Sequence, residues 1–581
     1  MMSGGFDLQG GFSLVLARGI SVGALLSLFG ALIFGAVIAP RAYVAMASDE
    51  IAVSQRRLRA VAAVSAAIGL LALLAWLILQ SADLAAANSL GATFAAIPTV
   101  VAHTFFGHLL CAQLAVLIAT ALMVALSKNA SYAAACVAGI GVLLQTGHSH
   151  AYSMYSALSV LLVADAVHLL AAGAWLGGLG PLLLLVRHAP PRAGALAARW
   201  FSPLGKWCVG AIVVTAAYQG WVLVASVPGL VGTAYGWMVL VKTILFAVLL
   251  GFACMNRYRF APALRGDAPD AARTTLVRSI TLQSCFAIAI VIAAATLSQL
   301  QPSMHTQAWW PFAWQFSLSA VREDPDIKRE VLGAAAILAG GLALLLMAFF
   351  LRRIRWAALV ALAAAVVALW LAMPHFDVLL VQAYPTSFYH SPTKFSSVTI
   401  VEGGKIFAGN CVPCHGANGE GNGPLAKSLP IPPADLTAAH LWMHSDGELF
   451  WWVSHGIENP EGGMAMPGFA PTLDPHQRWA VIDYIRAHNA GVTAHGNFPW
   501  PRAVHAPSFT ALCDGKPTRL ASLSGRWVRL LISTHDALAS NSQAASCVSG
   551  DPSIAHAYEI VSGLDNTAIA DEEFLIDSKG W

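Results

Sequence analysis

Long apolar runs occupy the first two thirds of the chain. A helix needs roughly twenty apolar residues to cross a bilayer, and charged or turn residues mark where each run ends. About ten runs of this kind occur, at residues 12–39, 60–80, 98–126, 131–147, 156–186, 206–226, 237–256, 279–299, 332–351 and 356–373. The pattern predicts a mainly α-helical fold whose largest part is a polytopic membrane bundle of about ten spans.

Basic residues gather in alternate connections between these runs. Short cytoplasmic loops retain Arg and Lys, so such loops indicate the inner side of the membrane. The basic connections contain Arg41, Arg56, Arg57 and Arg59; Lys128; Arg187, Arg192 and Arg199; Arg257, Arg259, Arg265 and Arg273; and Arg352, Arg353 and Arg355. We therefore expect both termini, and everything beyond about residue 374, on the outer side.

The composition agrees with a membrane protein. The 581 residues are 57% hydrophobic and only 11% charged, which is far more apolar than a soluble globular chain. The net charge of +3 is small, and the basic residues form no patch with interleaved aromatic residues. The sequence therefore gives no support for nucleic-acid binding, and the lipid bilayer is the expected surrounding.

The pattern changes abruptly after Met373, where a stretch rich in Pro, Ser, Thr and Tyr predicts a linker over 374–397. The motif CVPCH follows at 411–415. Two thiols on adjacent turns, Cys411 and Cys414, can add to the vinyl groups of a haem, and His415 can supply an axial nitrogen. A redox dithiol or half of a zinc site would be the alternatives, but no second CxxC or partner histidine spacing follows. The motif indicates covalently bound haem c.

The residues around this motif, "NCVPCHGANGEGNGPLA" and "MPGFAPTLDPHQRWAVIDYIR", resemble a small class I cytochrome c domain over residues 398–495. The resemblance implies His415 and a methionine as the two ligands of the haem iron. Met466, which precedes a proline, is the expected ligand, and Met464 is the second choice. In such families haem is attached on the outer side of the bacterial inner membrane, in agreement with the loop charges.

Ionisable residues also fall inside the apolar runs. Burying them in a membrane is costly unless they face a partner, a cavity or a cofactor. They are His103, His108 and His168 within predicted helices, and His148 and His150 at the outer end of the fourth span, with the thioether of Met154 just beyond. Imidazole and thioether ligands suit copper, so we expect a descent from His148, His150 and Met154 to His103 and then to His108 and His168.

Asp165 precedes His168 by one helical turn and is expected to accept its second N–H, which would fix the tautomer. The alternative for all these histidines is ordinary burial, with each ring bonded to a backbone carbonyl or a hydroxyl group.

The stretches "VAHTFFGHLL", "GHSHA", "ADAVHLLAAGAWLGGLGPLLLL" and "VKTILFAVLLGFACMNRYR" resemble the CopD copper-resistance family. The resemblance covers about residues 10–320 of the predicted membrane domain, residues 1–373. It implies copper handling at the inner membrane, usually transport or uptake from the periplasm, by His103, His108, His148, His150 and His168. Gly173, Gly177, Gly178 and Gly180 are expected to permit close helix packing.

Residues 496–581 carry "SFTALCDGKPTRLASLSGRWVRLLIST" and "EEFLIDSKGW", which resemble the start of a thioredoxin-like domain of α+β class. Where that family carries CxxC, this sequence reads Asp536 to Asn541, so thiol–disulfide exchange is not supported. Cys513 and Cys547 are expected to form a disulfide or to be free thiols without a functional role. Metal binding by Cys547 with Cys513 or His535 is the less favoured alternative.

Two functions follow. The first is a multi-pass copper-handling protein of the bacterial inner membrane, with copper and haem c bound and a periplasmic redox partner or copper chaperone. The second is a quinol-to-cytochrome electron-transfer protein, in which His108 and His168 would hold a b-type haem. With either function, we expect the protein to be a transporter or an electron carrier more than a catalyst. The sequence sets neither the direction of copper movement nor the oligomeric state.

Overall fold

The computed structural model describes residues 11–126, 132–149, 158–266, 268–350, 355–496, 504–533, 544–564 and 572–581. The chain divides into two compact units, Met1–Ala308 and Trp309–Trp581. The sequence placed the end of the membrane domain at residue 373, so the last two predicted spans group with the second unit instead.

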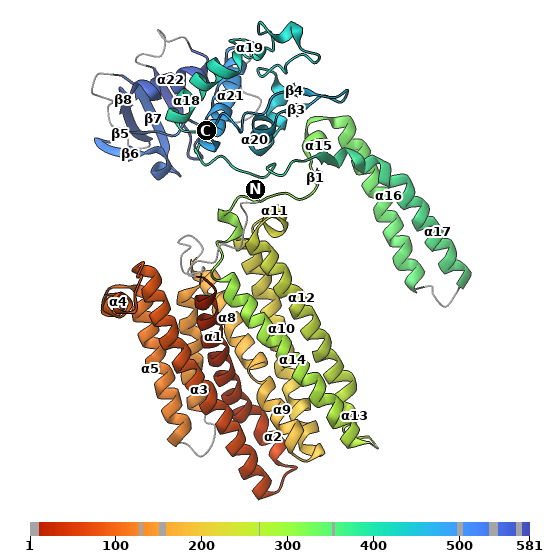
Figure 1. Cartoon of the computed structure of the whole chain (residues 1–581). Coiled ribbons are helices and arrows are strands. Elements are labelled where there is room, and N and C mark those ends of the chain that lie inside the picture. Colours follow the sequence, from red (N-terminus) through yellow and green to blue (C-terminus); the bar gives the residue numbers. More distant parts are fainter. Residues whose placement is uncertain are drawn as a thin grey trace. The chain divides into compact units, whose positions relative to one another are not determined.

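The first unit is a bundle of helices that run side by side (Figure 1). Its elements are α1 (Gly11–Ile33), η1 (Phe34–Ile38), α2 (Ala39–Tyr43), α3 (Ser48–Leu84), α4 (Leu90–His103), α5 (Phe105–Leu126), α6 (Tyr132–Leu144), η2 (Gln145–His148), α8 (Leu158–Leu176), α9 (Leu179–His188), α10 (Pro191–Leu223), α11 (Val227–Val231), α12 (Ala234–Met255), η3 (Asn256–Phe260), α13 (Ala261–Ala263), α14 (Pro269–Leu297) and η4 (Ser303–His305).

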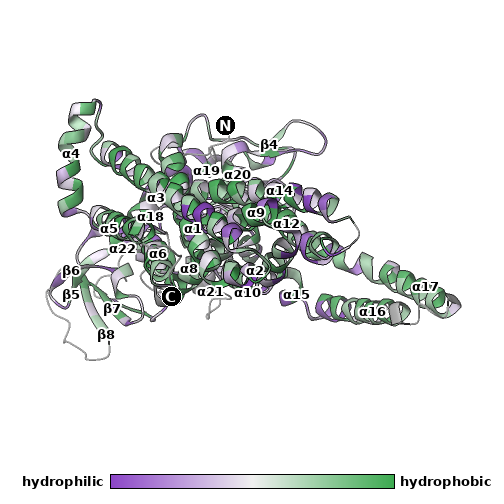
Figure 2. Cartoon of the chain, turned by 90° about the horizontal axis from the view of Figure 1, so that it is seen from below, coloured by the Kyte–Doolittle hydropathy of each residue, from purple (hydrophilic) through white to green (hydrophobic). Residues whose placement is uncertain are grey.

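The membrane character of the fold is confirmed. Among the described residues, nine helices are long and apolar enough to cross a membrane. The remaining predicted span, 131–147, corresponds to the shorter α6 and its continuation η2, which pack against α1, α5 and α8. Apolar residues dominate the helix surfaces (Figure 2), as expected where lipid is the solvent.

The predicted span 98–126 is wrong as a single helix. The chain leaves helical geometry at Thr104 (φ −114°, ψ 145°), where the hydroxyl donates to the carbonyl of Val100 and accepts from the N–H of Gly107. One threonine thus caps the end of α4 and the start of α5. A Cβ at Gly107 would lie 2.2 Å from the Val100 oxygen, so the corner needs glycine. α4 consequently extends to the side of α3 and α5 (Figure 2).

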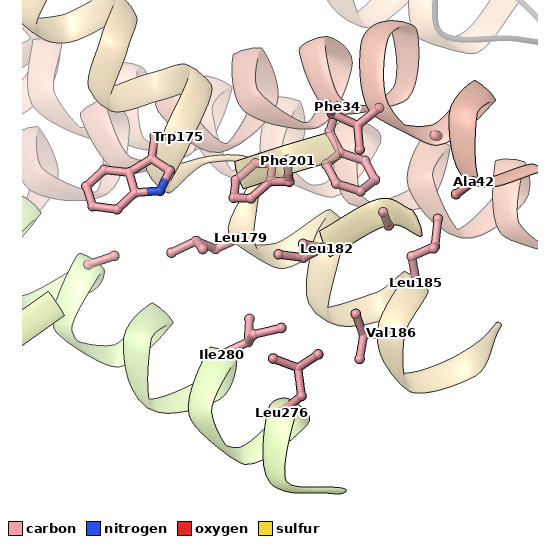
Figure 3. Close-up of a cluster of buried hydrophobic side chains, with 14 of the residues drawn as sticks. Phe34, Ala42, Trp175, Leu179, Leu182, Leu185, Val186, Phe201, Leu276 and Ile280 are labelled. Atoms are coloured by element: carbon pink, nitrogen blue, oxygen red, sulfur yellow. The ribbon is translucent and has the colours of Figure 1, made fainter. Parts of the chain in front are cut away.

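Two large buried clusters fill much of the described bundle, beside a smaller one that includes Leu161, Leu223 and Tyr235. One lies toward α2 and α9 and includes Phe34, Trp175 and Phe201 (Figure 3). The other, toward α4 and α5, includes Trp76 and Leu110. In the described part of the first unit, basic residues between the spans, such as Arg41, Arg187 and Arg265, lie at the end that carries α2, α9 and α13, drawn lowest in Figure 1. These members of the loop-charge pattern therefore share one end of the bundle.

The predicted role of the small residues is confirmed at three positions. A Cβ at Gly177 would lie 2.0 Å from the carbonyl oxygen of Leu26 on α1, and one at Gly173 would lie 2.8 Å from the ring of Phe29. Gly178 similarly accommodates Phe201, at 2.7 Å. Gly180 has nothing within 4 Å of such a Cβ, so close packing does not require it.

The second unit combines helices with three small sheets. Its elements are β1 (Trp314–Phe316), α15 (Ser319–Glu323), α16 (Pro325–Phe350), α17 (Arg355–Ala372), η5 (Met373–Leu379), β2 (Leu380–Gln382), α18 (Ser397–Asn410), α19 (Val412–His415), η6 (Ala426–Ser428), η7 (Ala439–Met443), α20 (Asp446–His455), β3 (Ile457–Glu458), β4 (Met464–Met466), α21 (Pro475–Gly496), β5 (Thr510–Cys513), β6 (Lys516–Arg519), η8 (Leu520–Leu523), β7 (Trp527–Ile532), β8 (Ala544–Ser549), α22 (Pro552–Ser562) and β9 (Glu573–Ile576).

The helices α16 and α17 pack against each other as a hairpin. The expected linker 374–397 is partly ordered, because β2 within it pairs antiparallel with β1. Further on, β5 to β9 form one sheet in the order β6-β5-β8-β7-β9, in which β7 and β8 are parallel. The expected α+β segment at the end of the chain is therefore present.

That sheet shares its core with the preceding helices. Ile400 on α18 and Ala487 on α21 lie in one buried cluster with Leu530 of β7 and Tyr558 of α22. A Cβ at Gly491 would lie 2.1 Å from the carbonyl oxygen of Ile560. Residues 398–495 and 496–581, expected as two domains, thus form a single packed body.

Candidate functional site

The CVPCH motif lies on a short helical turn directly after α18. Cys411 ends α18 and α19 spans Val412–His415. The following chain folds back over this turn through backbone hydrogen bonds. The N–H groups of Gly421, Gly423 and Leu425 donate to the carbonyls of His415, Cys414 and Pro413, respectively.

Glycine is required for this return. Gly416 has φ 79° and Gly421 has φ 75°, both in the left-handed region. Gly423 lies so close to the motif that a Cβ would come within 2.6 Å of the Cys414 carbonyl carbon. These glycines thus allow the returning chain to lie against the CVPCH turn.

The chemistry of the motif fits haem c. The Nδ1 of His415 is 3.0 Å from the carbonyl oxygen of Ala434, which can only accept, so Nδ1 carries the proton and Nε2 is left as the ligand nitrogen. Burial lowers the pKa of His415, which favours the neutral ring. Cys411 packs beside an apolar cluster containing Phe407 and Trp479, and burial raises the pKa of its thiol to about 12.

The two candidate methionines lie on β4, which pairs with β3. Met466 is half-buried, whereas Met464 is 49% exposed. A Cβ at Gly456 would lie 2.2 Å from the carbonyl oxygen of Met466, so the strand that carries both thioethers is held against the end of α20. Met466 is the more enclosed of the two sulfur donors.

In the membrane bundle, His148 ends η2 within a polar cluster. Its Nε2 is 3.2 Å from Oε1 of Gln113 on α5, and the amide nitrogen of Gln113 donates to Gln145, at 3.0 Å. Because Gln113 Oε1 accepts, His148 Nε2 donates and its Nδ1 is unprotonated. The ring also contacts Trp76 and Phe106, with centroids 4.7 and 5.3 Å away.

His168 is buried between α8 and α10. Its Nδ1 is 2.9 Å from the hydroxyl oxygen of Thr215, and that hydroxyl donates to the carbonyl of Ala211, at 2.7 Å. The single hydroxyl proton is therefore used, so Thr215 accepts from His168 Nδ1–H. The Nε2 of His168 is left as a free ligand nitrogen.

The expected partner of His168, Asp165, is not its hydrogen-bond acceptor. Asp165 interacts electrostatically with Lys242 on α12 and Arg18 on α1, and the Ser149 hydroxyl lies beside it. Thr215 on α10 takes the place expected for Asp165 as the acceptor of His168 Nδ1–H. Its Oδ2 is buried and accepts no hydrogen bond within the described part of the chain.

Arg18 connects this carboxylate to His148. Its guanidinium donates to the His148 carbonyl oxygen, at 2.6 Å, and stacks over the Trp76 ring, 5.3 Å from the centroid. The sequence predicted neither Arg18 nor Lys242 as part of the site. The available signal was a single basic residue within an otherwise apolar run, once in 12–39 and once in 237–256.

The other predicted copper ligands are not gathered at this cluster. His103 and His108 flank the corner between α4 and α5, and both are exposed. His108 Nε2 bonds to the carbonyl oxygen of Ala102, at 3.0 Å. The structure therefore does not bring His108 and His168 together as a facing pair for b-type haem. His150 and Met154 lie outside the described residues.

No group of three or more His, Cys, Asp or Glu side chains arranged to hold a metal ion occurs among the described residues. At the end of the chain, Cys513 and Cys547 face each other on β5 and β8 and form a disulfide. The position expected to carry CxxC, Asp536 to Asn541, and the alternative ligand His535 fall in the stretch that is not described.

Three family models match the chain. The model described as copper resistance protein D-like, N-terminal domain, covers residues 9–158, copper resistance protein D covers 195–297, and cytochrome c covers 400–489. The two copper-resistance matches lie in the first unit of the fold, and the cytochrome c match lies in the second.

Several curated relatives are similar to parts of the chain. The copper transport protein CutJ of Bacillus subtilis (strain 168) is 29% identical over 213 residues, 35% of this chain and 37% of CutJ. Copper resistance protein D of Pseudomonas syringae pv. tomato is 30% identical over 155 residues, 24% of this chain and 49% of that protein.

The cbb3-type cytochrome c oxidase subunit FixP of Azorhizobium caulinodans is 32% identical over 90 residues, 16% of this chain and 27% of FixP. The chain thus spans less than half the length of each of these relatives. No solved structure gives a significant match. The chain thus joins a membrane region that matches the copper resistance protein D models to a region that matches the cytochrome c model.

Proposed function

We propose that this protein takes up copper from the periplasmic side of the bacterial inner membrane through its helical bundle, and that its c-type haem exchanges electrons on that same side. The names of two relatives, a copper transport protein and a copper resistance protein, support the choice of ion. A periplasmic copper chaperone or redox partner would supply the ion or the electrons.

The protonation of two buried rings carries the proposal. His148 and His168 each have one nitrogen held by a neighbour, Gln113 or Thr215, and the other nitrogen unprotonated. A metal-binding histidine normally has this arrangement, because the second hydrogen bond fixes the tautomer and orients the ring.

The exposure of the rings suggests the order of the route. The exposed His103 and His108 would collect copper, His148 would receive it, and the buried His168 would hold it. The sequence adds His150 and Met154 as further ligands on the outer side. Asp165 lies one turn before His168 and would offset the charge of the ion. Because each stop offers few ligands, copper can leave as readily as it binds.

The haem would be attached by Cys411 and Cys414, with His415 and Met466 as its axial ligands. When bound, it supplies one-electron chemistry. Two features support a periplasmic location of this unit. The basic residues gather at the opposite end of the bundle from His148, and a disulfide such as Cys513–Cys547 persists in an oxidising compartment.

Copper flux in proteoliposomes tests the proposal. The purified protein would be reconstituted with a copper-sensitive dye inside the vesicles. We expect His148→Ala and His168→Ala to lower the initial rate at least tenfold. His305→Ala, which removes an exposed histidine from η4, should leave the rate unchanged. Equal rates in wild type and both membrane variants would contradict uptake through these rings.

A further inference from the structure

A second pair of histidines lies outside both sites. His440 and His444 occur at the two ends of η7 in the second unit, with their ring centroids 6.2 Å apart. When two imidazoles bind one ion, each nitrogen lies about 2 Å from the metal and roughly 1.1 Å from its ring centre, so the centroids lie at most about 6.2 Å apart, when the two nitrogens face each other across the ion. The two rings lie at this upper limit, and a small rotation of the exposed His440 ring would bring its nitrogen closer to a shared ion.

A buried carboxylate orients His444. The Nδ1 of His444 is 3.3 Å from Oε2 of Glu448, whose side chain is 6% exposed. Glu448 is itself fixed, because it accepts from the side-chain amide of Gln315, at 2.7 Å, and from the N–H of Ser445, at 3.1 Å. A carboxylate only accepts, so His444 Nδ1 carries the proton and Nε2 is a free ligand nitrogen. Carboxylate–histidine pairs of this kind support metal ligands.

The backbone between the two rings is held in place. Arg486, which is 8% exposed, donates to the carbonyl oxygens of Leu441 and His444, at 2.7 and 2.6 Å. A segment fixed before the ion arrives loses little freedom on binding. His440 is exposed and lies near the negative charge of Asp435, which favours a cation.

We propose that His440 and His444 form a docking site for Cu(II) on the haem-bearing unit. The proposal rests on the proposed function only for the identity of the ion. Two imidazoles are enough for Cu(II) because it binds nitrogen ligands more strongly than the other divalent first-row metals. So small a ligand set gives an exchangeable site and not a store. The Met443 side chain between them is 47% exposed and offers a thioether.

Titration of the purified, untagged full chain with Cu(II) tests this site. The chain would carry His148→Ala and His168→Ala to silence the membrane route, and bound Cu(II) would be followed by electron paramagnetic resonance. We expect a signal with nitrogen coupling from two imidazoles. Adding His440→Ala or His444→Ala should weaken binding at least tenfold, while the visible spectrum of the haem shows that the unit remains folded.

His556→Ala is the matched control. His556 is an exposed histidine beside a carboxylate, Glu559, at 2.9 Å, but it is not paired with a second imidazole in the ring contacts of the described residues. This control should leave Cu(II) binding unchanged. Binding that persists in both His440→Ala and His444→Ala, or that falls equally in the control, overturns the docking site. Copper flux in His440→Ala vesicles separately reports on the membrane route, so the two proposals fail independently.

Discussion

At the scale of single residues, hydrogen bonds decide which nitrogen of each ring can bind a metal. His148, His168 and His415 were all predicted from the sequence as ligands. Their partners were not, because each comes from a distant part of the chain: Gln113 on α5, Thr215 on α10, and the Ala434 carbonyl. Residue type predicts that a histidine can bind, whereas only the fold determines which atom is free.

Removing the hydroxyl at Thr215 tests this account directly. Thr215→Val keeps the shape but leaves His168 Nδ1–H without its acceptor, so the ring can turn or change tautomer. We expect copper affinity to fall about 10- to 100-fold, as for other residues that orient metal ligands. Competition with a copper chelator, using the purified full chain, measures the change.

Thr215→Ser retains the hydroxyl and is expected to bind copper as the wild type does. If valine at this position binds as tightly as serine, the hydrogen bond does not prepare His168 for a metal.

A buried carboxylate in the second unit gives a pH prediction. Asp483 accepts hydrogen bonds from Thr393 and Thr399, at 2.6 and 2.7 Å. Burial nevertheless raises the pKa of its carboxyl to about 6. The folded state therefore binds this proton more tightly than the unfolded state does. Protonated Asp483 stabilises the folded state fully at pH values below the ordinary pKa of an aspartate, and this contribution is lost as the pH rises through about 6.

The expected loss is about 2–3 kcal/mol of unfolding free energy between about pH 4 and pH 7, in comparison with Asp483→Asn, which does not titrate. Chemical denaturation of both proteins at each pH measures the difference, and other ionisable groups cancel between them. A constant difference across this range would show that Asp483 titrates normally.

At the scale of elements, apolar run length predicted where helices lie but not where they break. Nine of the expected spans appear as long apolar helices within the described residues, because length and composition decide membrane crossing. The corner at Thr104 was missed. An apolar run continues through it, and the only local signals, a capping threonine followed three residues later by glycine, also occur within uninterrupted helices.

The contact between α1 and the α8–α9 corner gives a prediction about packing. Gly177→Ala should destabilise the bundle by about 1–3 kcal/mol, because its Cβ would meet the Leu26 carbonyl and backbone must shift. Gly180→Ala, in open space, should be neutral or stabilising by up to about 1 kcal/mol, since alanine favours helix. Thermal unfolding in detergent measures both. Equal stability of the two variants would mean that α1 is not held this closely.

At the scale of the whole molecule, the sequence predicted a membrane bundle, a cytochrome c region and an α+β segment in the right order. It did not predict that the last two share one core. Burial alternates along β7 (Trp527–Ile532). Such alternation indicates that one face of the strand packs against other elements, but it does not identify those elements. The contacts of Ile400 and Ala487 with that sheet join residues far apart in the chain.

The shared core predicts that the disulfide stabilises the haem region as well. Replacing both Cys513 and Cys547 with alanine should lower the unfolding free energy of the second unit by about 2–4 kcal/mol. The haem absorbance transition and the loss of sheet signal should shift together in denaturant. Cys285→Ala, in the first unit, serves as the control. A haem transition that stays in place while the sheet unfolds earlier would show two independent domains.

The most direct test of copper handling by the buried rings is joint metal and haem analysis of the detergent-purified protein. The account predicts one covalent c-type haem per chain in the pyridine haemochrome spectrum. It also predicts bound copper that falls in His148→Ala and His168→Ala to the amount held by His440 and His444, while the c-type haem remains. A b-type haem that disappears with His168→Ala, or copper content equal in wild type and both variants, would contradict it.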